Sequence, residues 1–208
     1  MRSMLAVFTL LAVVTPAGAG VLWDEAADGD LADLINAGTS STVPPDFGNW
    51  TDLGAPAFGG HTVLGSANER TIPGGGFNID GDAIAFTIRP GLELANLTMD
   101  HNQSLGIREF FRLDAAGTGI DTVFIARGFP INQIFNTGLN TPATSDLLTL
   151  TGGRLGPGTY VFSWENALRF ANETVMTYSL NLTLVPAPGA VLLPCLGAIG
   201  LVRRRRRA

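Results

Sequence analysis

A strict alternation of apolar and polar residues between Tyr178 and Leu184 constrains the fold of this chain more than any other stretch of its sequence. The stretch reads YSLNLTL, so apolar and polar side chains take turns along it. Successive side chains of a β-strand point to opposite faces, and a period of two therefore predicts a strand with one face in a core and the other in water.

Two other stretches alternate in the same way. Ala83–Arg89 reads AIAFTIR, with its isoleucines and its phenylalanine on one face. A Pro90-Gly91 turn then leads into a second predicted strand, Leu92–Met99, which we expect to pair with the first.

The third alternating stretch follows a Gly-Pro-Gly turn at residues 156–158, where Tyr160, Phe162 and Trp164 share one face. We expect this strand to form an antiparallel hairpin with the strand at Tyr178–Leu184, because only a short loop separates them.

Shorter strands are predicted at Glu109–Leu113, Val123–Ala126 and Leu147–Leu150, and one short helix at Leu31–Ala37. The chain also has 26 glycines and 12 prolines, which favour turns over long helices. These elements together predict an all-β fold, an antiparallel β-sandwich over residues 21–184.

Charges are divided unevenly along the chain. All thirteen basic residues are arginines: Arg2, a cluster of five at residues 203–207, and seven in the body, which also holds all eighteen acidic residues. The body therefore carries a net charge of −11 (7 − 18). Such a surface repels phosphate backbones and argues against nucleic acid as a partner, whereas divalent cations and a hydrated polymer are compatible with it.

Residues 1–20 have the three parts of a secretory signal peptide. They are a basic start at Arg2, an apolar stretch from Met4 to Val14, and small residues after Pro16. The apolar stretch is too short to span a bilayer comfortably. We expect the general secretion machinery to export the chain with cleavage near residues 19–20, and an uncleaved N-terminal anchor is the alternative.

Residues 185–208 also have three parts. A turn at Pro186, Ala187 and Pro188 precedes an apolar stretch from Gly189 to Val202, and this stretch precedes the cluster Arg203, Arg204, Arg205, Arg206 and Arg207. The apolar stretch would rise about 21 Å as a helix, against about 30 Å for a hydrocarbon core, so the predicted transmembrane helix is short. Arginine is costly at the bilayer centre, so the cluster would stop translocation and leave the body outside.

This tail resembles the PEP-CTERM sorting signal of exported proteins in Gram-negative bacteria that make exopolysaccharide. In that family a Pro-Glu-Pro motif precedes a transmembrane run and an arginine cluster, and Ala187 stands here in place of the glutamate. The resemblance implies cleavage near the motif by an exosortase-type membrane peptidase. It also implies a tether to the inner membrane before cleavage, and the cell surface or extracellular matrix afterwards. A plain tail anchor with a stop-transfer cluster is the alternative.

The body contains short motifs in a suggestive order: WDEAADGDL from Trp23, DGDAIAFTIRPGLEL from Asp80, and GPGTYVFSWE from Gly156. This order resembles the pre-peptidase C-terminal-like jelly-roll domains of secreted bacterial proteins. The resemblance implies a jelly-roll-like sandwich with an accessory or binding role, and it carries over no catalytic residue.

Acidic residues gather at two places where calcium would find carboxylate oxygens. Asp80 and Asp82 flank Gly81 just before a predicted strand, and further acidic residues crowd the stretch from Asp24 to Asp33. Calcium takes about six to eight oxygen ligands, and neither stretch has the spacing of an EF-hand loop. Asp80 and Asp82 are the candidate calcium ligands, and Asp-Gly turns are the alternative interpretation.

No catalytic constellation is predicted, and we expect that the protein is not an enzyme. His61 and His101 are far apart in the sequence and the body lacks cysteine, so no zinc site is expected. Asp100 and His101 are adjacent in the sequence, and adjacent residues of a strand point to opposite faces, which argues against a catalytic pair. The sequence has no nucleophile elbow, phosphate loop or dinucleotide fingerprint.

The sequence therefore predicts an exported, non-enzymatic surface or matrix protein. The alternative is a carbohydrate-binding or adhesive accessory module, with an extracellular polysaccharide as its candidate partner and calcium as its candidate ion; no other cofactor is expected. For that alternative Trp50, which lies among proline, glycine and asparagine, is the candidate for stacking on a sugar. A secreted hydrolase is a third alternative, for which the sequence offers no catalytic constellation.

Overall fold

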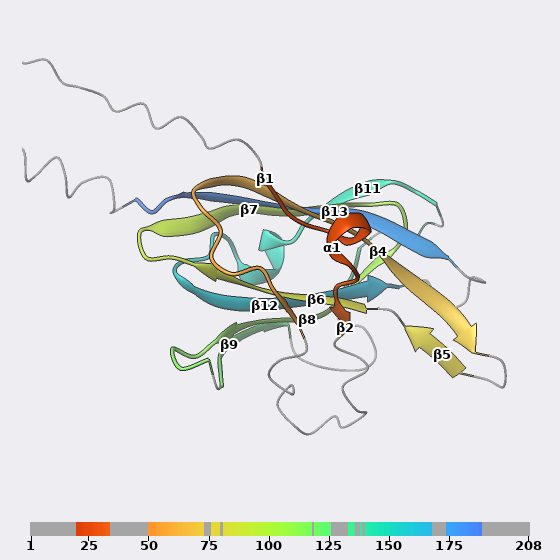
Figure 1. The fold of residues 1–208 in the computed structure, drawn as a ribbon. Coiled ribbons are helices and arrows are strands. Elements are labelled where there is room, and N and C mark those ends of the chain that lie inside the picture. The colour runs from red at the N-terminus through yellow and green to blue at the C-terminus, as the bar shows by residue number, and fades with distance from the viewer. Residues whose placement is uncertain are drawn as a thin grey trace, which may run out of the picture.

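The protein folds into two β-sheets that pack face to face, as Figure 1 shows. The structure is a computed structural model that describes residues 20–33, 50–72, 76–79, 81–117, 119–125, 133–135, 138, 140–167 and 174–188. The predicted all-β sandwich is confirmed. Both sheets are mixed rather than purely antiparallel, because β1 pairs with β4 and β3 pairs with β6 in parallel.

Sheet A has the strand order β1-β4-β13-β7-β11, and β5 pairs with the end of β4. The bounds are β1 Gly20–Asp24, β4 Gly59–Ile72, β13 Val175–Pro186, β7 Leu92–His101, β11 Ala143–Asp146 and β5 Gly76–Ile79. The alternating stretch YSLNLTL lies in β13, which is flanked on both sides by long antiparallel partners.

Sheet B has the order β10-β8-β12-β6-β2, with β9 also on β8 and β3 also on β6. The bounds are β10 Gln133–Phe135, β8 Leu105–Leu113, β12 Gly158–Asn166, β6 Gly81–Ile88, β2 Ala32–Asp33, β9 Ile120–Ile125 and β3 Thr51–Asp52. The long strands β8 and β6 flank β12. On its outer edge β8 pairs with the short strands β9 and β10, and β6 pairs with the short strands β2 and β3.

The core between the sheets is built from the alternating faces that the sequence predicts. Ile84, Phe86 and Ile88 are at most 1% exposed, and the apolar residues of β13 face them from sheet A. An aromatic row continues across the core, in which Phe162 stacks on Trp164 with ring centroids 5.0 Å apart and Trp164 meets Tyr178 edge-on at 5.2 Å. Trp164 therefore packs against an aromatic ring of the opposite sheet.

The two predicted pairings are wrong. β6 lies in sheet B while β7 lies in sheet A, and β12 and β13 are divided between the sheets in the same way. β6 pairs instead with β12, and β7 pairs with β13. The turn at Pro90-Gly91 thus carries the chain from one layer to the other. Alternation determines which face of a strand is buried, but it does not determine the strand's neighbour.

Two predicted short elements also differ from the structure. Leu147–Leu150, predicted as a strand, falls mostly in the 3-10 helix η1, Leu148–Thr151. Asp146 causes this turn, since its carboxylate accepts from Leu148 N at 3.0 Å and its carbonyl accepts from Thr149 Oγ1 at 2.7 Å. The helix predicted at Leu31–Ala37 begins as strand β2, and residues 34–37 lie outside the described residues.

Candidate functional site: a carboxylate cluster under the N-terminal strap

Residues 20–33 form a segment that crosses from one sheet to the other, and we call it the N-terminal strap (Figure 1). Its first strand, β1, joins the edge of sheet A beside β4, and its last strand, β2, joins sheet B beside β6. Between them Leu31, 3% exposed, inserts into the core. The strap therefore closes one side of the sandwich.

A single helical turn in the strap, α1 (Glu25–Asp28), orients the acidic residues. Asp24 caps its start by accepting from Ala26 N at 3.1 Å. Gly29 ends it with φ of +94°, a conformation that favours glycine, and the indole of Trp23 donates to its carbonyl at 2.9 Å. These local contacts reverse the chain, so that Glu25 points toward the sheets.

Glu25 is fixed by hydrogen bonds from both neighbouring strands of sheet A. Its carboxylate accepts from Ser66 N of β4 at 2.6 Å and from Tyr178 Oη of β13 at 3.0 Å. The contact needs glycine at position 65, because a Cβ there would overlap both the Tyr178 hydroxyl and the Glu25 carboxylate. The side chain of Glu25 thus connects the strap to the central strand of sheet A.

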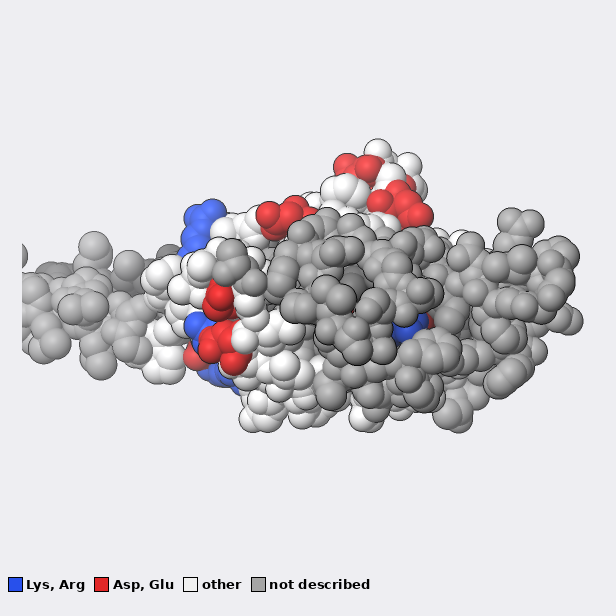
Figure 2. Space-filling view, turned by 90° about the horizontal axis from the view of Figure 1, so that it is seen from below, with Lys and Arg blue, Asp and Glu red and all other residues white. Residues whose placement is uncertain are grey.

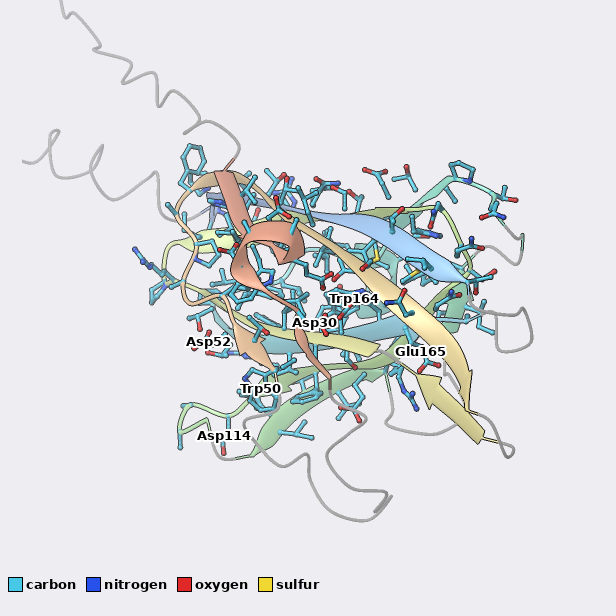
Figure 3. The ribbon with its side chains drawn as sticks, turned by 45° about the vertical axis from the view of Figure 1, so that its right-hand side comes forward. Asp30, Trp50, Asp52, Asp114, Trp164 and Glu165 are labelled. Carbon is cyan, nitrogen blue, oxygen red and sulfur yellow. The ribbon has the colours of Figure 1, made fainter. Side chains whose placement is uncertain are left out.

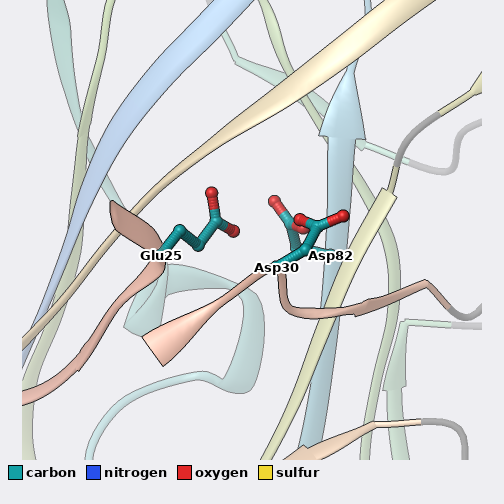
Figure 4. A group of neighbouring side chains, drawn as sticks. All are labelled: Glu25, Asp30 and Asp82. Atoms are coloured by element: carbon teal, nitrogen blue, oxygen red, sulfur yellow. The ribbon is translucent and has the colours of Figure 1, made fainter. Parts of the chain in front are cut away.

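Glu25, Asp30 and Asp82 place carboxylate oxygens within 4.8 Å of one another (Figure 4). Glu25 and Asp30 come from the strap, whereas Asp82 comes from β6 of sheet B and is 0% exposed. Asp82 pairs across the strands with Trp164 of β12, so its side chain points into the space between the sheets. The cluster therefore joins residues that are far apart in the sequence.

Burial governs the electrostatics of this cluster. It raises the pKa of the Glu25 carboxyl above its ordinary value, and the charge of Asp30 adds to the rise, although the hydrogen bonds from Ser66 and Tyr178 oppose it. Burial also raises the pKa of the Tyr178 hydroxyl, and the carboxylates of Asp82 and Glu25 raise it further. Tyr178 therefore stays a neutral hydrogen-bond donor at every physiological pH.

Three carboxylates so close together repel one another when all are ionised. Burial strengthens the repulsion at Asp82, while water screens it at Asp30, which is exposed. Either a shared proton or a cation relieves it. The three side chains are hard oxygen ligands of the kind that calcium prefers, and backbone carbonyls or water would have to complete its coordination. The arrangement has the chemistry of a cation site or of a carboxyl pair that shares a proton.

The sequence identified the members of this cluster only in part. Asp82 belongs to it, while Asp80 lies outside the described residues. Glu25 and Asp30 belong to the acidic stretch noted in the sequence, but nothing in their spacing shows that they meet Asp82. The contribution of Tyr178 was missed, because its place in the alternation of β13 marks it simply as a core residue.

Trp50 lies on the outer side of sheet B, whereas Trp164 lies between the sheets (Figure 3). Trp50 is partly buried and packs against a small apolar cluster made of Ala85, Phe111, Leu113 and Val161. The indole thus covers apolar side chains of sheet B, and its use in sugar stacking stays a prediction.

The two histidines contact backbone and hydroxyl groups. His61 Nε2 lies 2.8 Å from Ala57 O. His101 is 4% exposed and lies between Gln103 O at 2.6 Å and Ser145 Oγ at 2.8 Å, and burial lowers its pKa. Its neighbour Asp100 is exposed on the other face of β7, as the alternation predicts.

The predicted sorting motif lies directly at the end of a core strand. Pro186 is the last residue of β13, Ala187 N donates to Gly91 O at 2.9 Å, and Pro188 is exposed. Arg203, Arg204, Arg205, Arg206 and Arg207 lie outside the described residues, as do the signal peptide up to residue 19 and the apolar stretch after Pro188. Within the part of the chain that is described, no helix has the length and apolar character needed to cross a membrane.

The fold and the carboxylate cluster define a small two-sheet protein with a closing strap. No family model matches the chain, and no curated protein matches it. Among solved structures it is similar to PliG of Aeromonas hydrophila, a periplasmic lysozyme inhibitor of g-type lysozyme. The identity is 11%, the TM-score is 0.27, and the match covers 65% of this chain and 96% of that one. A likeness at this level supports no functional argument.

Proposed function

We propose that the protein is an exported, non-enzymatic protein of the cell surface or extracellular matrix, sorted through its C-terminal tail by an exosortase-type peptidase. The observation that supports this proposal is the position of the predicted terminal segments relative to the strands. The sequence predicts a signal peptide over residues 1–20 and a sorting tail over residues 185–208, and within the described residues the first strand, β1, begins at Gly20 and the last, β13, ends at Pro186.

The ends of the domain support removal of both terminal segments without loss of the fold. Gly20 is the first residue of β1 and pairs with His61, so cleavage after Ala19 keeps the strap complete. At the other end, cleavage beyond Ala187 keeps every residue of β13 and the bond from Ala187 N to Gly91 O. Processing at these sites would therefore leave every described strand of both sheets intact.

We also propose that the protein is not an enzyme, and the surroundings of His101 support this. Within the described residues, His101 contacts a backbone carbonyl and a serine hydroxyl that is itself buried. Asp100 faces the opposite side of the strand. Figure 2 shows small groups of acidic side chains among uncharged ones on the described part of one face. The net charge of −11 on the body fits a protein in contact with cations or a hydrated polymer.

Cell fractionation tests the sorting proposal. The intact chain and a variant lacking residues 203–207 are expressed in a Gram-negative host that makes exopolysaccharide, and both are followed by immunoblot. We expect the intact chain in the membrane and surface fractions, and the shortened chain in the periplasm or medium. The same cytoplasmic distribution for both chains would overturn the proposal.

The mass of the mature protein resolves the processing sites. A chain that begins near Gly20 and ends near Pro188 would support sorting by cleavage. A chain that retains the arginines would support the plain tail anchor instead. The measurement is intact-protein mass spectrometry of material recovered from cells.

The second candidate function is a calcium-binding accessory module of jelly-roll type that holds a carbohydrate. The cluster of Glu25, Asp30 and Asp82 supports the calcium-binding part of this candidate, because three carboxylates within 4.8 Å of one another offer hard oxygen ligands and a cation is one of the two ways to relieve their repulsion. This arrangement differs from the predicted pair of Asp80 and Asp82. A calcium ion there would lock the strap, which supplies two of the three side chains, onto sheet B.

A further inference from the structure

The outer face of sheet A carries a row of hydrogen-bonded polar side chains that crosses four strands. Thr62 Oγ1 of β4 donates to Asn181 Oδ1 of β13 at 3.2 Å, and Asn181 Nδ2 donates to Asp100 Oδ2 of β7 at 3.1 Å. Thr144 Oγ1 of β11 donates to the other oxygen of Asp100 at 2.5 Å. We call these four residues the polar row.

The polar row belongs to a face made of short polar side chains. On β13 the outward residues after Val175 are Thr177, Ser179, Asn181 and Thr183, and on β7 they include Asn96, Thr98 and Asp100. Soluble proteins usually carry many charged side chains on their surfaces, whereas the outward residues of these two strands are mostly short and uncharged. Threonine, serine and asparagine instead form a flat surface whose groups are held in place.

A shallow open depression of about 610 Å³ adjoins the end of the polar row at Asp100 and Thr144. Its lining also includes Asn102, Pro142, Thr177 and Ser179. Asn102 Oδ1 accepts from Thr177 N at 2.8 Å, which fixes the orientation of its amide. The depression thus presents hydroxyl, amide and carboxylate groups in one place.

From this arrangement we infer that the outer face of sheet A binds a neutral polysaccharide, with the polar row and the depression as its contact surface. A sugar hydroxyl both donates and accepts hydrogen bonds, and hydroxyl and amide side chains do the same. Neighbouring strands lie about 4.7–4.9 Å apart, so the row offers one polar group per strand at a spacing comparable with one pyranose ring. Mutual hydrogen bonds already order these side chains, which lowers the entropy lost on binding.

The negative charge of this face and of the body favours an uncharged polysaccharide over an anionic one. The four residues of the polar row include one carboxylate and no basic side chain, and the whole body carries −11. An anionic polysaccharide would therefore be repelled from this face, whereas an uncharged one would not. This inference rests on the proposed accessory role and names its partner and its surface, which is distinct from that of Trp50.

Native affinity electrophoresis of the full chain, purified in mild detergent, tests the inference. The gels contain dextran, galactomannan or hydroxyethyl cellulose as neutral probes, and alginate as the anionic contrast. We expect at least one neutral polymer to retard the protein and alginate not to. Asp100→Ala should weaken retention about fivefold, the effect of losing one hydrogen-bonded contact.

Two matched controls separate binding from folding. Asp121→Ala and Thr122→Val make comparable changes on β9 of sheet B, where both residues are exposed, and should leave retention unchanged.

Thr144→Val is a second test variant of the polar row. It keeps the size of an exposed residue while removing its hydroxyl, and it should also weaken retention. Unaltered retention in both Asp100→Ala and Thr144→Val, or no retention by any neutral polymer, overturns the inference. Fractionation tests export separately, so a protein that is exported but never retarded refutes this inference alone.

Discussion

Asp82 and Trp164 are paired residues on the adjacent strands β6 and β12, so a carboxylate that is 0% exposed lies beside the largest aromatic ring of the core. An ionised carboxylate in such a place is costly unless a partner compensates its charge. Tyr178, whose ring meets Trp164 edge-on, and the strap residues Glu25 and Asp30 complete its surroundings.

Calcium should raise the melting temperature of the protein. A divalent ion that binds the cluster only in the folded state stabilises that state by mass action, and at a hundredfold excess over its dissociation constant the gain is about 2.7 kcal/mol. Asp82→Asn should abolish the calcium response, while Asp121→Asn on exposed β9 should preserve it. Scanning calorimetry with calcium and then with EDTA is the measurement. An unchanged melting temperature at millimolar calcium would reject the cation site.

Without calcium, the stability of the protein should fall as the pH rises from the range of an ordinary glutamate toward neutrality. The pKa of Glu25 is higher in the folded chain than its ordinary value, so the folded state holds this proton more tightly. The resulting stabilisation is complete below the unfolded pKa and is lost as the pH passes through the folded pKa.

Glu25→Gln tests this pH dependence. The variant should show a flatter dependence of the urea midpoint on pH than the wild type. Asp121→Asn should keep the wild-type slope, because Asp121 is exposed and lies outside the carboxylate cluster. Equal slopes for the wild type and Glu25→Gln would show that Glu25 does not hold the proton.

Gly65→Ala should destabilise the domain by about 1–3 kcal/mol, the usual cost of overpacking. The added methyl group would overlap the Tyr178 hydroxyl and the Glu25 carboxylate, and it would push the strap away from β4. Gly156→Ala is the matched control, because a Cβ there meets nothing within 4 Å. Thermal melting and limited proteolysis are the measurements, with new cleavage in residues 20–33 expected for Gly65→Ala alone.

Tyr178→Phe should cost about 1.5–3 kcal/mol, because it removes a hydrogen bond to a partly buried carboxylate. Tyr160→Phe removes a hydroxyl that donates to the backbone carbonyl of Gly156 at 2.9 Å, and it should cost about 0.5–1.5 kcal/mol. Denaturant unfolding of both variants gives the comparison. Equal losses would mean that Glu25 is uncharged in the native protein.

Trp50→Ala should destabilise the protein by about 2 kcal/mol, less than the 3–5 kcal/mol typical of a fully buried aromatic residue. The reason is its packing against Phe111 and Val161 on the outer side of sheet B. A melt with unchanged stability, together with lost binding to a neutral polysaccharide, would instead restore Trp50 as a sugar-stacking residue.

The sequence predicts the strand faces of this protein better than its strand partners. The alternation in Tyr178–Leu184 and in Ala83–Arg89 correctly identifies the core-facing side of β13 and β6, although on β6 the residues of the other face, Ala83 and Ala85, are buried as well. Both predicted pairings fail, because a short connection can either form a hairpin within one sheet or cross between two sheets. The pattern of apolar residues is the same in the two cases.

The candidate site shows the same limit more strongly. Composition identifies an acidic N-terminal stretch and Asp82 separately, but their meeting depends on a strap that leaves sheet A and ends on sheet B. Gly65 is decisive for the contact between Glu25 and Tyr178, yet a single glycine in a strand gives no such indication in advance. Convergence of this kind arises from tertiary structure, which local periodicity does not encode.

The bond between Glu25 and Tyr178 joins residues 153 positions apart, nearly the full length of the folded domain. β4 pairs with β1 of the strap on one side and with β13 on the other. The first and last described strands must therefore come together before this side of the sandwich closes. Contacts of such high sequence separation slow folding, because the entropy of closing a long loop is lost before the contact forms. The domain is therefore expected to fold slowly and as a single unit. A chain truncated before β13 should not form a stable fold.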